Sequence, residues 1–108
     1  MDPRAFFETE LPNRLLGVVD ALPDGVVVGF ELVEGGAWQL RAEGGRTFVE
    51  VGCTGPKDCL VRCSSDEFSR IIIGSWAATR AYLDGRLAIE GDVGLLLRLR
   101  PLLAARTA

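Results

Sequence analysis

The chain of 108 residues contains no histidine, and this absence removes several kinds of chemistry at once. Without imidazole there is no histidine general base, no Ser-His or Cys-His relay, and no zinc site that needs an imidazole ligand. The single lysine, Lys57, falls in a predicted turn, whereas a catalytic lysine needs burial to lower its pKa. The 12 basic residues face 15 acidic ones, and the net charge of −3 argues against nucleic-acid binding.

Long apolar runs are missing as well. The wholly apolar stretches are a few residues long, far below the ~20 residues that a transmembrane helix needs. The N-terminal residues 1–4 include an acid and no apolar core, unlike a secretory signal peptide, and the C-terminal residues 106–108 form no peroxisomal address. These features predict a cytoplasmic protein.

The three cysteines, Cys53, Cys59 and Cys63, predict neither a disulfide framework nor a metal site. Cys59 and Cys63 are four residues apart in a predicted strand, which separates their Cα atoms by about 13 Å, beyond disulfide reach. Their spacing matches no zinc motif, so we interpret all three as small core residues.

Apolar residues, in contrast, are abundant. They make up 48% of the sequence beside 25% charged residues, a balance that favours a folded chain over a disordered one. At this length we expect one domain, residues 1–108, with a single core.

The first 25 residues predict two helices. The first begins with Asp2 as N-cap and Pro3 at the first helical position. The second is expected from Pro12 to Leu22, because apolar residues recur there at helical spacing. That stripe consists of Leu11, Leu15, Val18, Val19 and Leu22.

The hydrophobic period then changes to two, which predicts strands. We expect strands over residues 26–33, 38–42, 46–53 and 58–63, joined by glycine-containing turns. Because each turn is short, these four strands are predicted to form an antiparallel meander.

Helices return at Ser64, which forms with Glu67 the S-x-x-E pattern of a capping box. Two helices are expected as far as about Asp84, followed by a short strand over residues 85–91. Asp92 then caps a last helix. The apolar stripe of that helix consists of Leu95, Leu96, Leu99, Leu102 and Leu103.

Catalytic constellations are scarce. The serines have no histidine to activate them, and the adjacent acids Asp66 and Glu67 are explained by the dipole of a helix start. The glycine pairs at residues 35–36 and 44–45 lie in predicted hairpin turns rather than between a strand and a helix, which argues against a phosphate-binding loop.

One stretch of the sequence, residues 58–95, points to a particular protein family more specifically than the order of helices and strands does. It opens with the strand D-C-L-V-R-C at residues 58–63 and continues with a serine-capped helix that contains Phe68 and Gly74. It closes with A-Y-L-D-G-R-L-A-I-E-G-D-V-G-L at residues 81–95. In this order, and above all in the G-[KR]-L-x-[IV]-x-G-[DN] signature, the chain resembles the sterol carrier protein type 2 family. A looser match covers the N-terminal half.

The resemblance implies an α+β fold: a mixed five-stranded sheet, taken as the four-stranded meander plus a short fifth strand, with helices on one face around a hydrophobic tunnel. In this family the tunnel holds a lipid and the last helix acts as a lid. The resemblance therefore implies a non-enzymatic carrier without a cofactor. Its ligand would be a hydrophobic molecule such as a fatty acid, an acyl-CoA, an isoprenoid or quinone, or a sterol.

Carried over to this sequence, the resemblance assigns the ligand-binding residues to the sheet, the middle helices and the lid. They are Val49, Val51, Val61, Phe68, Ile71, Ile72, Trp76, Tyr82, Leu83, Leu95, Leu96, Leu99 and Leu103. Each is equally compatible with ordinary core packing, because a lipid site and a core use the same residue types. Arg86, Arg98 and Arg100 are either partners for an anionic head group or solvated flanks.

Two positions depart from the family pattern. Ala77-Ala78 stands where Asn-Pro is common, which changes the pocket mouth that the resemblance implies. Pro101 interrupts the last helix after about two turns and either kinks the lid or ends it early.

Other functions stay open beside the carrier. Leu97 points away from the stripe of the last helix, so it is either a tolerated surface leucine or a contact for a membrane, a protein partner or a second copy in a homodimer. If Leu97 contacts a protein partner, the chain is an accessory module of an enzyme. The third hypothesis is an enzyme acting on a hydrophobic substrate with Tyr82, Glu90 or Asp92 as acid or base.

Overall fold

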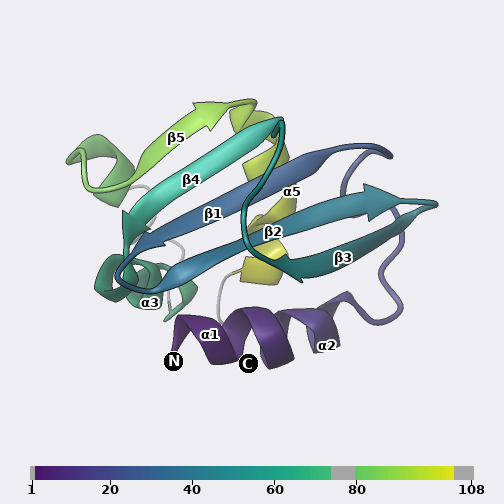
Figure 1. The fold of residues 1–108 in the computed structure, drawn as a ribbon, viewed down its shortest axis with the longest axis horizontal. Helices are drawn as coiled ribbons and strands as arrows, with labels where there is room; N and C mark the ends of the chain where they lie inside the picture. Colours follow the sequence, from purple (N-terminus) through teal and green to yellow (C-terminus); the bar gives the residue numbers. More distant parts are fainter. Residues whose placement is uncertain (1, 74–79, 104–108) are drawn as a thin grey trace.

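The computed structural model describes residues 2–73 and 80–103 (Figure 1). Trp76, Gly74 and the Ala77-Ala78 departure lie outside the described residues. Residues 80–83 are helical. The other elements are α1 (Pro3–Ala5), the π-helical turn η1 (Phe6–Glu10), α2 (Leu11–Leu15), β1 (Val27–Val33), β2 (Gly36–Glu43), β3 (Arg46–Val51), β4 (Cys59–Ser64), α3 (Ser65–Ile73), β5 (Ala88–Gly91) and α5 (Val93–Leu103).

The five strands form one mixed sheet in the order β3-β2-β1-β4-β5. The pairs β1–β2, β2–β3 and β4–β5 are antiparallel, whereas β1 and β4 are parallel. The predicted mixed five-stranded sheet is therefore confirmed.

The prediction of a four-stranded meander is wrong, because the meander ends with β3. The chain then crosses to the far side of β1, where Phe30 of β1 lies beside Val61 of β4. Asp58 fixes this parallel start: its backbone N–H donates to the Val27 carbonyl at 2.8 Å, and its Oδ2 accepts from the Val27 N–H at 2.9 Å.

The helices cover one face of the sheet, as expected, and Figure 1 shows α5 crossing behind the strands. Phe7, from the N-terminal helical segment, lies at the centre of the packing. Its ring stacks on Trp38 at 4.8 Å and on Phe68 at 5.1 Å between centroids, and it packs on Phe30 at 5.1 Å. The core thus joins the N-terminal helical segment, the sheet and α3 through aromatic contacts.

The N-terminal helices differ from the prediction. One helical segment runs from α1 through η1 to α2, and it ends at Leu15 instead of Leu22. Gly17 and Asp20 adopt positive φ angles of 79° and 56°, which a right-handed helix does not contain. Residues 16–22 therefore form an irregular loop.

The predicted caps hold at two helix starts. Ser64 Oγ accepts a hydrogen bond from the Glu67 N–H at 3.0 Å, and Asp92 Oδ1 accepts one from the Gly94 N–H at 2.9 Å. Pro101, expected to kink or end the last helix, lies inside α5, which continues to Leu103. Among the described residues, no helix has the length and apolar character needed to cross a membrane.

Candidate functional site

The structure divides the predicted ligand-binding residues into three groups. Val49 and Leu96 are half-buried, and Trp76 lies outside the described residues. Val51, Tyr82 and Leu83 lie on the surface with 77%, 51% and 77% of their area exposed. The buried group consists of Val61, Phe68, Ile71, Ile72, Leu95, Leu99 and Leu103.

The buried group comes from β4, α3 and α5 and belongs to the one apolar cluster between the helices and the sheet. One member, Phe68, packs directly against the N-terminal aromatic residues: its ring stacks on Phe7 and meets Phe6 edge-on. The structure therefore brings these predicted residues together in the interior.

A cleft lies at another place, between the end of α2 and the edge strand β3. Its volume is about 440 Å³, inside the range of roughly 300–1,000 Å³ that is usual for small-molecule sites. The turn after α2 and the loop that follows form one wall, and β3 forms the other. The lining residues are Pro12, Leu15, Leu16, Gly17, Val18, Val19, Arg46, Thr47, Phe48 and Val49.

Most of the side chains that line the cleft are apolar. Leu16 and Val19 are 76% and 72% exposed and Phe48 is 41% exposed, so the cleft presents apolar side chains to the solvent. Among the predicted ligand-binding residues, Val49 lines this cleft. The sequence interpretation missed the wall formed by residues 16–19 because it extended the second helix to Leu22. Gly17, inside that predicted helix, was the one sign that the helix could end earlier.

The residues proposed for an enzymatic role have structural partners or exposed positions. Glu90 forms an ion pair with Arg62 at 3.2 Å, Asp92 caps α5, and Tyr82 lies on the surface. Glu90 and Asp92 thus each make a structural contact.

The cysteines are free thiols that stay neutral at ordinary pH. Burial raises the pKa of the Cys63 thiol to about 11, and the charge of Glu67 adds to this effect. Burial also raises the pKa of Cys59, with a smaller contribution from Asp92. Cys59 and Cys63 belong to the apolar core, as the sequence predicts. The prediction is wrong for Cys53, which follows β3 and is only half-buried. A neutral thiol is a poor nucleophile.

Two of the arginines considered for a head group are bound to the protein itself. Arg86 Nη1 donates to the Glu67 carboxylate at 2.7 Å. Arg98 donates to the backbone carbonyls of Asp20 at 3.0 Å and Ala21 at 3.3 Å. Arg100 is exposed on α5.

Comparison with known proteins defines the class of this fold. The sequence pattern of the SCP-2 sterol transfer family matches residues 23–104, which include all five strands and α5. The chain belongs to the SCP-2 sterol transfer family, and its class is that of the SCP2-like lipid- or sterol-binding domains.

Particular relatives agree with this assignment. A segment of 76 residues is 33% identical to hydroxysteroid dehydrogenase-like protein 2 of Xenopus tropicalis; the match covers 69% of this chain but spans only 18% of that protein. The solution structure of sterol carrier protein domain 2 of Helicoverpa armigera matches 99% of this chain and 84% of its own, with 21% identity and a TM-score of 0.62. The structure of palmitated SCP2L2 from Aedes aegypti matches 99% of this chain and 100% of its own, with 16% identity and a TM-score of 0.62.

Proposed function

We propose that this domain binds one hydrophobic molecule and carries it without transforming it. The observation that supports this best is the cleft between α2 and β3, which is large enough for a small molecule and lined mainly by apolar side chains. Enclosing an apolar tail there would stabilise the complex by about 0.8 kcal/mol per buried methylene. The Aedes aegypti relative, described as palmitated, adds support from the same fold.

The buried residues predicted as ligand-binding remain part of the proposal. In this arrangement the ligand enters at the cleft, and its tail extends past Val49 towards the cluster that contains Leu99. Val49 is half-buried on the strand that forms the cleft wall, so it lies at the junction of the two regions.

Titration with apolar ligands tests the proposal. Native mass spectrometry of the purified protein, followed by titration with a fatty acid, an acyl-CoA, an isoprenoid quinone and a sterol, should show saturable binding of at least one. The double variant Leu16→Asn/Val19→Asn should weaken that binding about ten-fold, since two aliphatic contacts are replaced by amides. Absence of saturable binding for every ligand would refute the carrier function.

A matched control is available outside the cleft. Val33 and Leu97 are 64% and 61% exposed and do not line it. The variant Val33→Asn/Leu97→Asn therefore makes the same chemical change on another surface, and we expect its ligand affinity to equal that of the unaltered protein. Equal losses of ligand affinity in both variants would show that the ligand binds outside the cleft.

An accessory domain within a larger protein is the second candidate. It is favoured by the Xenopus tropicalis relative, which is several times longer than the matched segment and has a dehydrogenase-like name. Leu97, 61% exposed on α5, would then contact the partner or neighbouring domain. Light scattering after size exclusion, alone and with a candidate partner, tests this: Leu97→Asn should abolish any complex and leave ligand binding unchanged.

A further inference from the structure

The edge strand β3 has one unpaired side. At the end of this strand the Gly52 N–H donates to the Ala37 carbonyl of β2 at 2.8 Å. Because backbone groups alternate between the two sides of a strand, those of the even-numbered residues of β3 face β2, and those of Thr47 and Val49 face away from it. Among the described residues, no strand pairs with this second side. The N–H and C=O groups of Thr47 and Val49 are therefore oriented to pair with a further strand.

The cleft keeps the unpaired side of β3 accessible. The loop after α2 contacts this side at its start, where the Gly45 carbonyl accepts a hydrogen bond from the Asp20 N–H at 2.9 Å. From Arg46 to Val49, the cleft of about 440 Å³ separates the strand from α2 and the loop. The strand also lacks the proline and lysine residues that commonly protect an exposed edge, and Phe48 in its middle is 41% exposed. The edge is thus open along its central residues.

The residues of β3 are complementary to a second copy of the same strand. In an antiparallel pair related by a two-fold axis at Phe48, Arg46 lies opposite the partner's Glu50. In the same register Thr47 lies opposite the partner's Val49, so their free backbone groups meet as a hydrogen-bonded pair. A shift of the register by one residue loses these hydrogen bonds, and a shift by two places Phe48 opposite a charge. One register therefore satisfies both the backbone and the charges.

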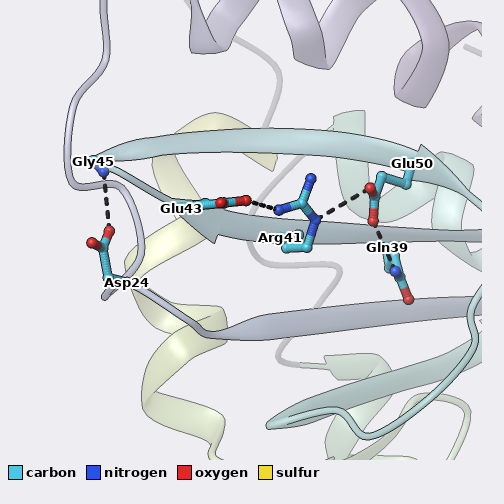
Figure 2. A network of polar contacts seen from close by, with 6 residues as sticks. All are labelled: Asp24, Gln39, Arg41, Glu43, Gly45 and Glu50. Atoms are coloured by element: carbon cyan, nitrogen blue, oxygen red, sulfur yellow. Dashed lines mark hydrogen bonds and ion pairs between the residues drawn. The ribbon is translucent and has the colours of Figure 1, made fainter.

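The charges on the face of the sheet away from the helices fit this pairing. Figure 2 shows Arg41 bound to the Glu43 carboxylate, which lies opposite Arg46 within the chain. Among the described residues, no ion pair joins Arg46 to a carboxylate. Glu50 accepts hydrogen bonds from Gln39 at 2.9 Å and from Arg41 at 3.2 Å, which lower its pKa and keep it ionised. Each oxygen of Glu50 accepts one of these bonds and keeps a second lone pair, so Glu50 can also accept from an arginine of another copy.

From this arrangement we infer that two copies of the chain pair through their β3 strands and join their five-stranded sheets into one continuous sheet. In this dimer Arg46 of each copy binds the partner's Glu50, and the two Phe48 rings pack together at the axis. Arg41, whose guanidinium lies 5.2 Å from the centroid of the Phe48 ring, flanks this aromatic pair. The inference goes beyond the carrier function and does not depend on it, since no ligand takes part in the pairing.

The mass in solution tests the pairing first. Size exclusion with light scattering, at protein concentrations up to about 1 mM, should show the mass rise from 11.7 kDa towards twice that value. Thr47→Pro removes a backbone donor on the free side of β3 and no hydrogen bond to β2, so it should weaken dimerisation by about ten-fold or more. A protein that keeps the mass of a single chain at every concentration would overturn the inference and leave the carrier function intact.

Exchange of charges tests the register. Arg46→Glu and Glu50→Arg each place like charges opposite one another, and each should weaken self-association by about ten-fold or more. An equal mixture of the two variants should associate about as well as the unaltered protein, because position 46 then faces the opposite charge at position 50. Arg100→Glu makes the same change at an exposed position of α5 and should leave self-association unaltered. Two folded variants that do not associate with each other, or unchanged self-association of Arg46→Glu, would overturn the inference. Should Glu50→Arg fail to fold, Arg46→Glu and Thr47→Pro decide the question.

Amide hydrogen exchange locates the interface. The Thr47 and Val49 amides should exchange more slowly at high than at low protein concentration, since they are hydrogen-bonded in the dimer and face solvent in the single copy. Leu97→Asn, at a position 61% exposed on α5, should leave dimerisation unchanged. A dimer that is lost in Leu97→Asn, or that does not protect the Thr47 and Val49 amides, would have its contact on another surface and would overturn the inference.

Discussion

Arg86 and Glu67 form an ion pair with a distance of 2.7 Å between Nη1 and Oε1, which joins the turn before β5 to the first turn of α3. Glu67 is only 6% exposed, and Arg70 approaches its other carboxylate oxygen at 3.6 Å. Arg86 belongs to the G-R-L signature that carries the family resemblance, so one residue of this signature has the physical task of compensating a buried charge.

Replacing Arg86 by leucine should destabilise the domain by about 1–3 kcal/mol, since the buried carboxylate loses its closest partner and keeps only the distant Arg70. Arg86 is itself 42% exposed, so the loss should fall below that of a fully buried pair. Urea unfolding at pH 7 measures the change. The control is Asp84→Asn, which removes the exposed second partner of Arg86 and should cost less than about 0.5 kcal/mol. Equal effects of the two substitutions would contradict this account.

The raised pKa of Cys63 predicts a loss of stability in alkali. Between the ordinary thiol value of 9.0 and the folded value of about 11, the unfolded chain loses the Cys63 proton while the folded chain keeps it. The unfolded state then binds fewer protons, so this group lowers the free energy of unfolding by up to about 1.4 kcal/mol for each pH unit in that window. Cys63→Ala removes this contribution, and its stability difference from the unaltered protein should shrink between pH 8 and pH 11. Ser64→Ala, which changes no titrating group, should keep a constant difference of about 1 kcal/mol for the lost cap.

Much of the fold could be predicted because its signals are local. The alternation of Cys59, Val61 and Cys63 identifies the buried face of β4, and the capping residues Ser64 and Asp92 identify two helix starts. The partner of β4 could not be derived in the same way. Alternation shows which face of a strand is buried but not which strand lies beside it, and the contact between Asp58 and Val27 depends on the folded crossover.

The candidate site was harder to predict for a related reason. A helix that continued to Leu22 would have placed Val18 and Val19 on its apolar face, and no cleft would have been expected there. The positive φ angles of Gly17 and Asp20 turn the chain away, which leaves Val19 exposed beside β3. The sequence also could not show that Arg98 is bound to the backbone carbonyls of Ala21 and Asp20, since these residues lie 77 and 78 positions away along the chain.

Two glycines of the family signature should respond very differently to the same substitution. Both have positive φ, 94° at Gly91 and 79° at Gly85. A Cβ at Gly91 would lie 2.3 Å from the carbonyl oxygen of Asp58, whereas a Cβ at Gly85 would meet nothing within 4 Å. Gly91→Ala should therefore cost about 3 kcal/mol or more, from backbone strain and a clash with the β4 start, and Gly85→Ala about 1–2 kcal/mol from strain alone. Chemical denaturation of both variants checks this order, and a smaller cost at Gly91 would contradict the close approach.

The cleft wall formed by residues 16–19 should depend on Arg98, which holds the next two residues of the same loop. Its guanidinium donates to the Asp20 and Ala21 carbonyls and so fastens the loop to α5, 77 residues away along the chain from Ala21. Arg98→Gln should cost about 1 kcal/mol of stability, less than the roughly 1.5–3 kcal/mol typical of hydrogen bonds to charged groups because this site is exposed. It should also speed amide hydrogen exchange in the loop. Because Val19 then loses its fixed place, the affinity for any ligand of the cleft should fall, whatever its head group. Arg100→Gln on the same helix is the control and should change neither exchange nor affinity; unaltered exchange at residues 16–22 in Arg98→Gln would show that the loop is held by its own packing instead.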